Sequence, residues 1–346
     1  MSDQPNEPTS VKAAGYGFYT FTAEEFNDQL GDTYEVEKIL GQGGMGAVYK
    51  GTRVSDGLAV AIKMLPAEIA SLEKSESGFG FVERFEREAQ AMARLDHPNI
   101  IKVYEYGVTN SGTHFFTMEF VEGHDLHYYI KEGRLTQGHA FSWLTQICEA
   151  LAYAHKEGIV HRDIKPANIM IDDEGRVKLA DFGLVKVIGS DSLLSLNTNV
   201  AMGTPEFTAP EIIDQDGIGD NRADIYSVGV LAYQFLTARL PRGVWKAPSA
   251  LVPGLDPRLD VVLERALNAA PDDRYPCISE MGDELVKIAT TKYVPEEESE
   301  EPAAAPTQKP AKSKAPALIG GLVGLGVILL GAIFFFNNSK KETVNN

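Results

Sequence analysis

Short runs of apolar residues, separated by glycines and polar residues, open the patterned part of the chain. They occur at Tyr34–Leu40, Ala47–Tyr49 and Ala59–Ile62, and two similar stretches lie at 100–106 and 114–120. Short runs of β-branched and aromatic residues bounded by turn residues are typical of strands. This part of the chain is therefore predicted to form a small β-rich lobe.

Helical periodicity begins inside this region and dominates the chain after it. Within residues 85–95, apolar side chains recur at three- and four-residue intervals, which places them on one side of a helix. After Gly123 the pattern is mostly helical, and residues 140–155 are a clear example. A small β lobe followed by a larger helical lobe predicts an α+β fold with a cleft between the lobes.

The N-terminal segment, residues 1–33, precedes this pattern and is predicted to be loosely ordered. Within it, Thr22 and Glu25 have the spacing of a capping box, in which two side chains satisfy free backbone groups at a helix start. That pair predicts a short helix carrying Phe26. Residues 1–10 are polar and lack the apolar segment of a secretory signal.

The composition changes near residue 291. Residues 295–302 are an acidic run and residues 303–316 are rich in alanine, proline and lysine, so residues 291–316 have too little apolar surface to fold alone. Residues 317–336 carry no charge and no proline, and as a helix they would span about 30 Å, the thickness of a bilayer's hydrocarbon core. A buried core helix is the alternative. We predict a globular domain at 34–290, a linker at 291–316, a transmembrane helix at 317–336 and a short tail at 337–346.

Charge and composition exclude some classes of function. The formal net charge is −17, which argues against nucleic acid as the main partner because phosphates attract basic surfaces. The only cysteines, Cys148 and Cys277, cannot form a disulfide framework, and we expect reduced thiols in apolar surroundings. His124 and His127 lie three residues apart without a supporting cluster of cysteines or carboxylates, so we interpret them as structural.

Candidate chemistry begins with a glycine-rich segment, Gly41–Val48, which matches G-x-G-x-x-G-x-V. Glycines let backbone N–H groups approach phosphates closely because no Cβ stands in the way. Dinucleotide-binding turns share this spacing, but they need a helix after the glycines, whereas strands are predicted on both sides here. Lys63 ends Val-Ala-Ile-Lys, the pattern of a strand that presents a lysine to nucleotide phosphates.

The most specific string is His161-Arg-Asp-Ile-Lys-Pro-Ala-Asn168. Asp163 is placed to accept the proton of a hydroxyl group, and Asn168 is placed to hold a magnesium ion. Asp181, in Asp-Phe-Gly, supplies a second metal-binding group, and Ala209-Pro-Glu211 closes the segment. Phosphoryl transfer needs positioning and charge neutralisation. The ordered motifs predict a phosphotransferase that uses ATP and Mg²⁺, with Mn²⁺ as an alternative ion.

On these motifs, residues 34–288 resemble the protein kinase superfamily and, within it, the bacterial eukaryotic-like serine/threonine kinases. Gly-Gln-Gly-Gly-Met-Gly, Phe85-Glu-Arg-Glu-Ala and His97-Pro-Asn-Ile are similar to that bacterial branch. The resemblance implies a bilobal fold with a β-rich N-lobe and a larger helical C-lobe. It also implies that the domain at 34–290 is a protein kinase domain acting on protein substrates.

The resemblance implies roles for individual residues. Glu88 would pair with Lys63, and Lys165 would steady the γ-phosphate, as in kinases that act on serine and threonine rather than tyrosine. Thr204 would lie near Asp163 in the loop that receives the substrate residue. The implied catalytic residues are Asp163, Lys165, Lys63 and Glu88, and the implied metal ligands are Asn168 and Asp181.

The resemblance further implies an adenine pocket, with Met118 as gatekeeper and a hinge from Glu119 to Val121. The implied ATP-binding residues are Leu40, Gly41, Gly43, Gly44, Gly46, Val48, Ala61, Lys63, Met118, Glu119, Val121 and Met170. Residues expected to stack as a spine between the lobes are His161, Phe182, Met92 and Val103. Other residues with implied structural roles are Asp224, Arg274 and Glu211, the last two as a pair.

Three features depart from the family pattern. Lys63 and Glu88 lie 25 residues apart, longer than usual, so residues 67–80 are predicted to hold an extra loop or helical turn. Four prolines between residues 240 and 260 exclude the long helix of many members, which weakens any family-based account of substrate recognition. Residues 337–346, after the predicted span, are too few for an extracellular sensor domain.

Two other classes of function are compatible with parts of the pattern. A membrane-anchored pseudokinase scaffold would usually lack one of Lys63, Asp163 and Asp181, and all three are present. A small-molecule phosphotransferase of kinase-like fold would usually lack the segment from Asp181 to Glu211. A membrane-anchored serine/threonine protein kinase is therefore the favoured prediction.

Regulation and location are predicted from residues outside the catalytic motifs. Arg162 can pair with a phosphate on the activation loop, where Thr198 is the first candidate and Ser195 the second; unmodified loop residues are the alternative. Since the domain needs cytosolic ATP, we expect a single-pass cell-membrane protein with a cytoplasmic kinase domain and the tail on the far side. Gly320 and Gly324 would allow a homodimer through the span, and no association is the alternative.

Overall fold

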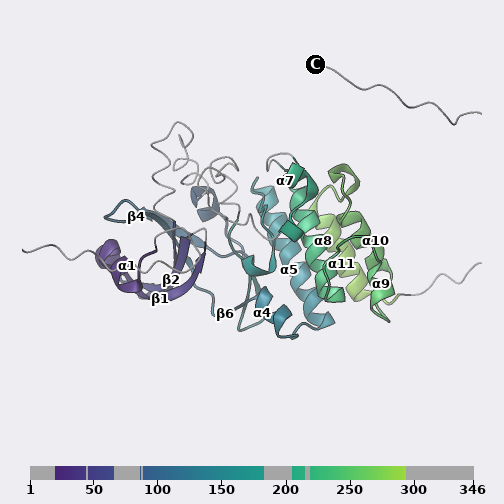
Figure 1. Ribbon diagram of the computed structural model, residues 1–346, viewed down its shortest axis with the longest axis horizontal. Helices are drawn as coiled ribbons and strands as arrows, with labels where there is room; N and C mark the ends of the chain where they lie inside the picture. The colour runs from purple at the N-terminus through teal and green to yellow at the C-terminus, as the bar shows by residue number, and fades with distance from the viewer. Residues whose placement is uncertain are drawn as a thin grey trace, which may run out of the picture. The chain divides into compact units, whose positions relative to one another are not determined.

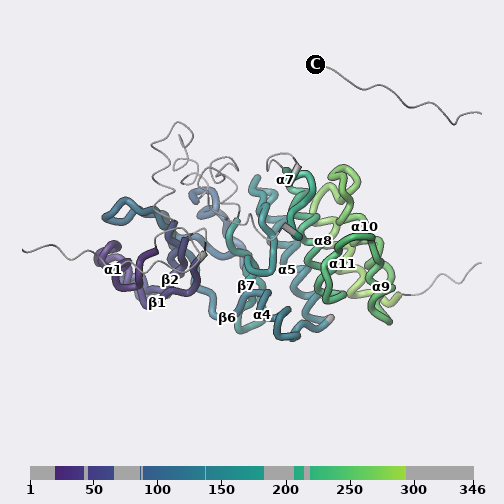
Figure 2. The backbone as a smooth tube through the Cα atoms, in the orientation of Figure 1, coloured from purple at the N-terminus to yellow at the C-terminus, as the bar shows by residue number. Residues whose placement is uncertain are grey.

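The computed structural model describes residues 20–43, 46–65, 86, 89–182, 205–214 and 219–293. Strands drawn in purple and blue form one lobe, and helices drawn in teal and green form the other (Figure 1). In the described residues, the backbone trace runs through the N-lobe strands first and through the C-lobe helices afterwards (Figure 2). The predicted α+β bilobal fold, with a β-rich N-lobe and a helical C-lobe, is confirmed.

Five antiparallel strands form the N-lobe sheet, in the order β1-β2-β3-β5-β4. They are β1 (Tyr34–Gly43), β2 (Gly46–Arg53), β3 (Leu58–Met64), β4 (Val103–Val108) and β5 (His114–Glu119). The register places Val48 opposite Lys63 and Ala61 opposite Met118. Since Ala61 and Lys63 are two residues apart on one strand, all four residues lie on the same face of the sheet.

A short helix, α1 (Ala23–Leu30), precedes the sheet and begins at the predicted capping box. The Thr22 hydroxyl accepts a hydrogen bond from the Glu25 backbone N–H at 3.2 Å, and the Glu25 carboxylate accepts one from the Thr22 N–H at 2.7 Å. A 3₁₀ turn, η1 (Gly31–Thr33), then leads into β1. The helix is therefore set by a local sequence signal.

Phe26 anchors this helix in the N-lobe core. Its side chain is fully buried, and its ring centroid lies 4.4 Å from that of Tyr49 and 6.3 Å from that of Phe115. The loose order predicted for the N-terminal segment is therefore wrong for residues 20–33. Burying a phenylalanine stabilises the folded state by about 1.5–3 kcal/mol, enough to hold a short segment in place.

The helix predicted at 85–95 is present at residue 86 and at 89–93 in the described chain. Ala89, Met92 and Leu95 are all buried, as their spacing predicts. After it, Ile100 forms a β-bridge to Leu179 of the C-lobe. This segment therefore joins the N-lobe sheet to the small C-lobe sheet.

The C-lobe is built around α8, which is apolar on almost every face because other helices surround it. Its helices are α4 (Leu126–Lys131), α5 (Gln137–Lys156), α7 (Pro210–Asp214), α8 (Arg222–Thr237), α9 (Pro248–Leu251), α10 (Arg258–Ala266) and α11 (Ile278–Thr290). Its 3₁₀ turns are η2 (Pro166–Asn168), η3 (Pro205–Phe207) and η4 (Pro271–Asp273). A three-stranded sheet comprises β6 (Gly123–Asp125), β7 (Ile169–Asp172) and β8 (Val177–Leu179).

The prolines between residues 240 and 260 have the predicted effect. Between the end of α8 at Thr237 and the start of α10 at Arg258, the chain forms only the four-residue helix α9. Pro248 is the first residue of that helix, a position where the missing N–H costs nothing. The long helix excluded by the sequence is therefore absent from this described stretch.

Among the residues that the structure describes, no helix is both long and apolar enough to cross a membrane. The predicted transmembrane helix at 317–336 and the tail at 337–346 lie outside those residues, as does the linker from residue 294 onward. The insertion predicted at 67–80 also lies outside them.

Candidate active site

Lys63, on β3, meets a carboxylate of the C-lobe. Its Nζ lies 2.5 Å from Oδ1 of Asp181, and the lysine side chain is only 7% exposed. Burial alone would raise the pKa of Asp181, but the charge and hydrogen bond of Lys63 lower it overall. Burial removes most of the hydration of the ammonium group, and the Asp181 carboxylate is the interaction that compensates for this loss. This ion pair therefore connects the N-lobe directly to the C-lobe.

The catalytic-loop string brings three polar side chains together. The Asp163 carboxylate accepts a hydrogen bond from Lys165 Nζ at 2.7 Å and from Asn168 Nδ2 at 2.8 Å. Asn168 Nδ2 also donates to the Asp163 backbone carbonyl at 2.8 Å. Because the nitrogen of the Asn168 amide is held by Asp163, its oxygen is the atom that can coordinate a cation. Asp163 remains 24% exposed, so a substrate hydroxyl can reach it.

Asp224, from the first turn of α8, holds the beginning of this loop. Its fully buried carboxylate accepts hydrogen bonds from the backbone N–H groups of His161 and Arg162, at 2.8 and 2.7 Å. It also accepts one from His155 Nε2 at 2.8 Å. Arg162 has a φ of +63°, an unfavourable conformation for a residue with a side chain. The bonds to Asp224 therefore stabilise a strained backbone beside the candidate base.

Asp181 also has a left-handed backbone, with a φ of +57°. The residues on either side of it are held against the catalytic loop. Ala180 N–H donates to the Asn168 carbonyl at 2.9 Å, and the Ala180 carbonyl lies 2.9 Å from His161 Nε2. Burial lowers the pKa of His161, so its neutral ring donates to this carbonyl. The strain at Asp181 is thus maintained by contacts that aim its carboxylate at Lys63.

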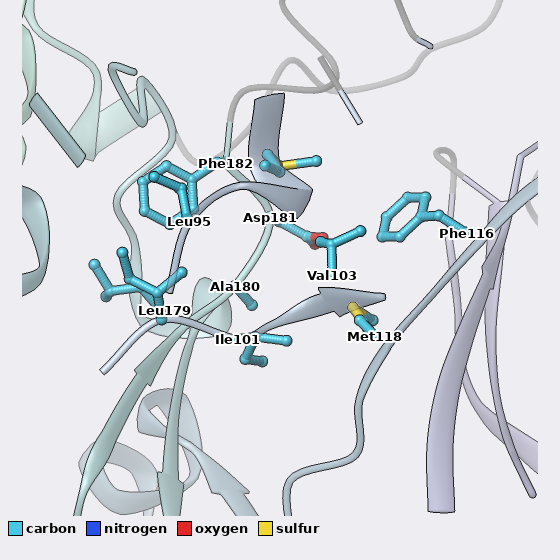
Figure 3. Close-up of a pocket in the computed structure, with 11 residues that line it drawn as sticks. Leu95, Ile101, Val103, Phe116, Met118, Leu179, Ala180, Asp181 and Phe182 are labelled. Carbon is cyan, nitrogen blue, oxygen red and sulfur yellow. The ribbon is translucent and has the colours of Figure 1, made fainter. Parts of the chain in front are cut away.

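The structure shows one contact of the predicted spine and brings three of its members to one space. The rings of His161 and Phe182 lie 4.4 Å apart between centroids, and both side chains are buried. Phe182, Val103 and the gatekeeper candidate Met118 line one small space (Figure 3). Met92 lines the same space. Apolar side chains from both lobes therefore line one space together with Asp181.

The candidate nucleotide site lies along β1, β2 and β3. Gly41 pairs with Val48, and Gly43 pairs with Gly46, while Gly44 lies outside the described residues. Gly46 has a φ of +108°, and a Cβ there would lie 1.9 Å from the Met64 carbonyl oxygen. Only glycine fits that position. Leu40, the residue before this segment, is exposed.

The candidate hinge joins β5 to β6. The Glu119 backbone N–H donates to the Lys102 carbonyl at 2.8 Å, and the Glu119 carboxylate accepts from Lys178 Nζ at 2.6 Å. Val121 is partly buried against the main core. Met170, on β7, pairs with Asp125 of β6 and comes from the C-lobe. One folded unit therefore contains the hinge, Met170 and the face of the N-lobe sheet that carries Val48.

Two residues of this site were missed by sequence reasoning. His155 orients Asp224, and Lys178 holds the Glu119 carboxylate. The sequence around His155 is that of an ordinary helix, and the sequence around Lys178 is that of an ordinary strand. Their roles become visible only from the carboxylates that they contact in the folded protein. The Arg274–Glu211 pair was predicted and is present, with two bonds of 2.7 Å.

Several predicted site residues fall outside the described residues. Besides Gly44, they are Glu88, Ser195, Thr198 and Thr204. The structure therefore describes the Lys63–Asp181 pair without describing the residue expected to pair with Lys63. Within the described part of the chain, no three His, Cys, Asp or Glu side chains form a metal-binding cluster.

The two-lobed fold, with a lysine, two aspartates and an asparagine facing the junction of its lobes, is that of a kinase-type phosphotransferase. Residues 34–250 match the family model for the protein kinase domain. The chain belongs to the protein kinase family, and its relatives place it among the bacterial serine/threonine kinases of that family. The resemblance predicted from the sequence is confirmed.

Curated relatives match over most of this chain. A probable serine/threonine-protein kinase of Streptomyces coelicolor is 36% identical over 271 residues, which cover 73% of this chain and 39% of that protein. Serine/threonine-protein kinase PknL of Mycobacterium tuberculosis is 37% identical over 284 residues, which cover 77% and 68%. This chain thus spans less than half the length of the Streptomyces protein.

A solved structure is also similar. The kinase domain of Mycobacterium tuberculosis PknI, crystallised as a double mutant, matches with a TM-score of 0.59 and 31% sequence identity. The match covers 74% of this chain and 95% of the PknI chain. The similarity therefore extends over nearly the whole PknI kinase domain.

Proposed function

We propose that this chain is an ATP-dependent serine/threonine protein kinase that transfers the γ-phosphate of ATP to hydroxyl groups of protein substrates. The observation that carries the proposal is the geometry around Asp163. Its carboxylate is held by Lys165 and Asn168, remains accessible, and belongs to the same folded unit as the Lys63–Asp181 pair. Phosphoryl transfer depends on this combination of a base, positive charge and metal-binding oxygens.

In the proposed reaction, Asp163 accepts the proton of the substrate hydroxyl as that oxygen attacks the γ-phosphorus of ATP. The bond from the γ-phosphorus to the β–γ bridging oxygen breaks, and ADP leaves. Lys165, already 2.7 Å from Asp163, is placed to neutralise charge on the transferred group. Lys63 would hold the nucleotide phosphates. Relatives named as serine/threonine kinases support the choice of substrate hydroxyl.

Asn168 and Asp181 fit the role of Mg²⁺ ligands. Magnesium prefers hard oxygen donors, and these residues provide an amide oxygen and a carboxylate. The hydrogen bonds from Asn168 Nδ2 to Asp163 leave the amide oxygen available. Bound Mg²⁺ would neutralise negative charge on the phosphates. Asp181 would then exchange part of its interaction with Lys63 for the ion.

The adenine ring would lie against the sheet face that carries Val48, Ala61 and Met118, with Met170 on the opposite side. Val48 and Ala61 come from neighbouring strands, and Met170 comes from the C-lobe. Leu40 and the glycine-rich turn would cover the nucleotide, and backbone groups from Glu119 to Val121 would bind its edge.

A direct test is transfer of labelled phosphate from ATP to generic protein substrates. Asp163→Asn should lower kcat by roughly 10²–10⁴, the range for loss of a general base. Asp173→Asn is the matched control, since Asp173 is exposed in the turn after β7 and should leave kcat unchanged. Near-wild-type turnover by purified Asp163→Asn protein would exclude the proposed mechanism, and no transfer by the wild type would favour a pseudokinase.

We further propose that residues 317–336 anchor the kinase in the cell membrane, with the kinase domain in the cytoplasm. The support is the uncharged, proline-free sequence of that segment and the requirement of the active site for ATP. Protease added outside intact cells should then spare the kinase domain. A homodimer through Gly320 and Gly324 belongs to the same proposal, and isoleucine at both positions should abolish its crosslinking.

A further inference from the structure

A loop of the C-lobe, residues 239–247 between α8 and α9, has a defined conformation without being helical. Its start is fixed where the Arg239 backbone N–H donates to the Thr237 hydroxyl at 3.2 Å. Its end is fixed where the Tyr233 hydroxyl donates to the Lys246 carbonyl at 3.0 Å. Since α8 holds both ends, the surface of this loop is a stable feature of the fold.

Two adjoining hollows follow this loop and form one groove, which we call the α8–α9 groove. One hollow, of ≈ 360 Å³, lies beside Tyr233 and Trp245. The other, of ≈ 280 Å³, lies beside Glu206 and Thr208. Arg242 lines both hollows. The groove therefore runs from the segment after Thr204, the predicted substrate loop, to the aromatic side chains near α9.

The charge of this groove is opposite to that of the whole chain. The chain has a formal net charge of −17, yet residues 225–255 contain no Asp or Glu and include Arg239, Arg242 and Lys246. Arg242 forms an ion pair with Glu206. Arg239 and Lys246 are exposed, and neither has an ion-pair partner among the residues that the structure describes. Two uncompensated positive charges thus face solvent along the groove.

Apolar side chains lie beside these charges. Val244 is 86% exposed on the loop, and Ile213, which lines the smaller hollow, is 62% exposed. Trp245 is partly buried, with its ring centroid 5.6 Å from that of Tyr233. Exposed apolar surface next to positive charge is complementary to a polypeptide that carries both acidic and apolar side chains.

We infer that the α8–α9 groove docks an acidic segment of the protein substrate. Acidic side chains of that segment pair with Arg239 and Lys246, and an apolar side chain enters the hollow beside Trp245. The groove reaches Glu206 and Thr208, which follow the predicted substrate loop at Thr204 closely in the sequence, and this favours a substrate over an unrelated partner. This inference rests on the proposed kinase activity.

Binding is tested first, on the full-length chain in detergent. The probe is a short fluorescent peptide rich in glutamate, with one phenylalanine and no hydroxyl residue; a glutamine version is its control. Arg239→Gln combined with Lys246→Gln should raise the Kd roughly threefold to tenfold, as expected for two partly exposed ion pairs. Lys131→Gln combined with Lys292→Gln removes two exposed charges elsewhere and should leave the Kd unchanged.

Phosphorylation is tested second, with an acceptor peptide that carries or lacks the acidic segment. The groove variant should raise KM only for the extended peptide and leave kcat and the KM of the short peptide unchanged. Equal binding by both double variants, or an altered oligomeric state of the groove variant, would overturn the inference. Peptide binding without phosphorylation of any acceptor would instead contradict the kinase activity, and with it the substrate role of the groove.

Discussion

The ammonium group of Lys63 lies 2.5 Å from the carboxylate of Asp181, although 118 residues separate the two in the sequence. Burial raises the pKa of Asp181, and Lys63 more than offsets this, so the pKa is lowered overall. A carboxylate with a lowered folded-state pKa contributes stability above its unfolded pKa and loses it as the pH falls through the folded value. The pair is therefore intact at neutral pH and weakens only below about pH 4.

Replacing the lysine tests the chemical importance of this pair. Lys63→Met should lower kcat by roughly 10²–10³, because the phosphates lose a charge-stabilising group in a partly dry site. Lys50→Met, on the adjacent strand β2, is the control, since Lys50 pairs with Glu37 at the surface. Steady-state kinetics with labelled ATP would measure both, and equal kcat values would remove Lys63 from the mechanism.

Replacing Glu211 tests whether its ion pair with Arg274 stabilises the C-lobe. Glu211→Gln should destabilise the fold by about 3–5 kcal/mol, because it leaves a buried guanidinium without its carboxylate. The Arg274 side chain is 0% exposed and Glu211 is 10% exposed. Urea unfolding followed by tryptophan fluorescence would measure the loss. Glu264→Gln, at an exposed position of α10, should change stability little, and equal losses in the two variants would contradict this account.

Replacing Phe26 tests how much α1 contributes to the stability of the N-lobe. Phe26→Ala should cost about 3–5 kcal/mol, since it opens a cavity beside Tyr49 and Phe115. Thermal unfolding of the full chain should show a lower midpoint, while Phe26→Leu should recover much of the loss. An unchanged midpoint in the alanine variant would mean that α1 does not support the sheet.

The two cysteines should differ in reactivity. Burial raises the pKa of Cys148 to about 12, and its side chain is almost inaccessible, whereas Cys277 is partly exposed at the start of α11. Because the thiolate is the reactive form, Cys148 should resist N-ethylmaleimide in the native protein. Mass spectrometry should show a single adduct, at Cys277, before unfolding and two after it. Rapid native labelling of Cys148 would contradict the described packing.

His161 should produce a pH dependence of stability. Burial lowers its pKa, so the unfolded chain binds more protons than the folded chain once the pH falls below about 6.5. Stability should therefore decrease in that range, with a contribution of at most about 1.4 kcal/mol per pH unit from this histidine. His161→Tyr should make the decrease shallower in urea unfolding. Parallel pH profiles would show that His161 titrates normally.

Much of the fold was predictable because its signals are local. Alternation of apolar residues predicted the N-lobe strands, the Thr22–Glu25 spacing predicted α1, and the prolines between 240 and 260 excluded a long helix. The sequence also placed Asp163, Lys165 and Asn168 within one short loop. Each signal acts over a few residues, through backbone hydrogen bonds and side-chain periodicity.

Other features depend on contacts that no local pattern encodes. Asp224 reaches the catalytic loop from a helix 62 residues away, and His155 orients it from a second helix. Likewise, the burial of Phe26 makes its segment, residues 20–33, part of the N-lobe core, although that segment was predicted to be loosely ordered. The sequence by itself thus determined the chemical groups and the elements that carry them. Only the tertiary structure decided which groups meet, because burial and pairing of charges depend on the packing of distant segments.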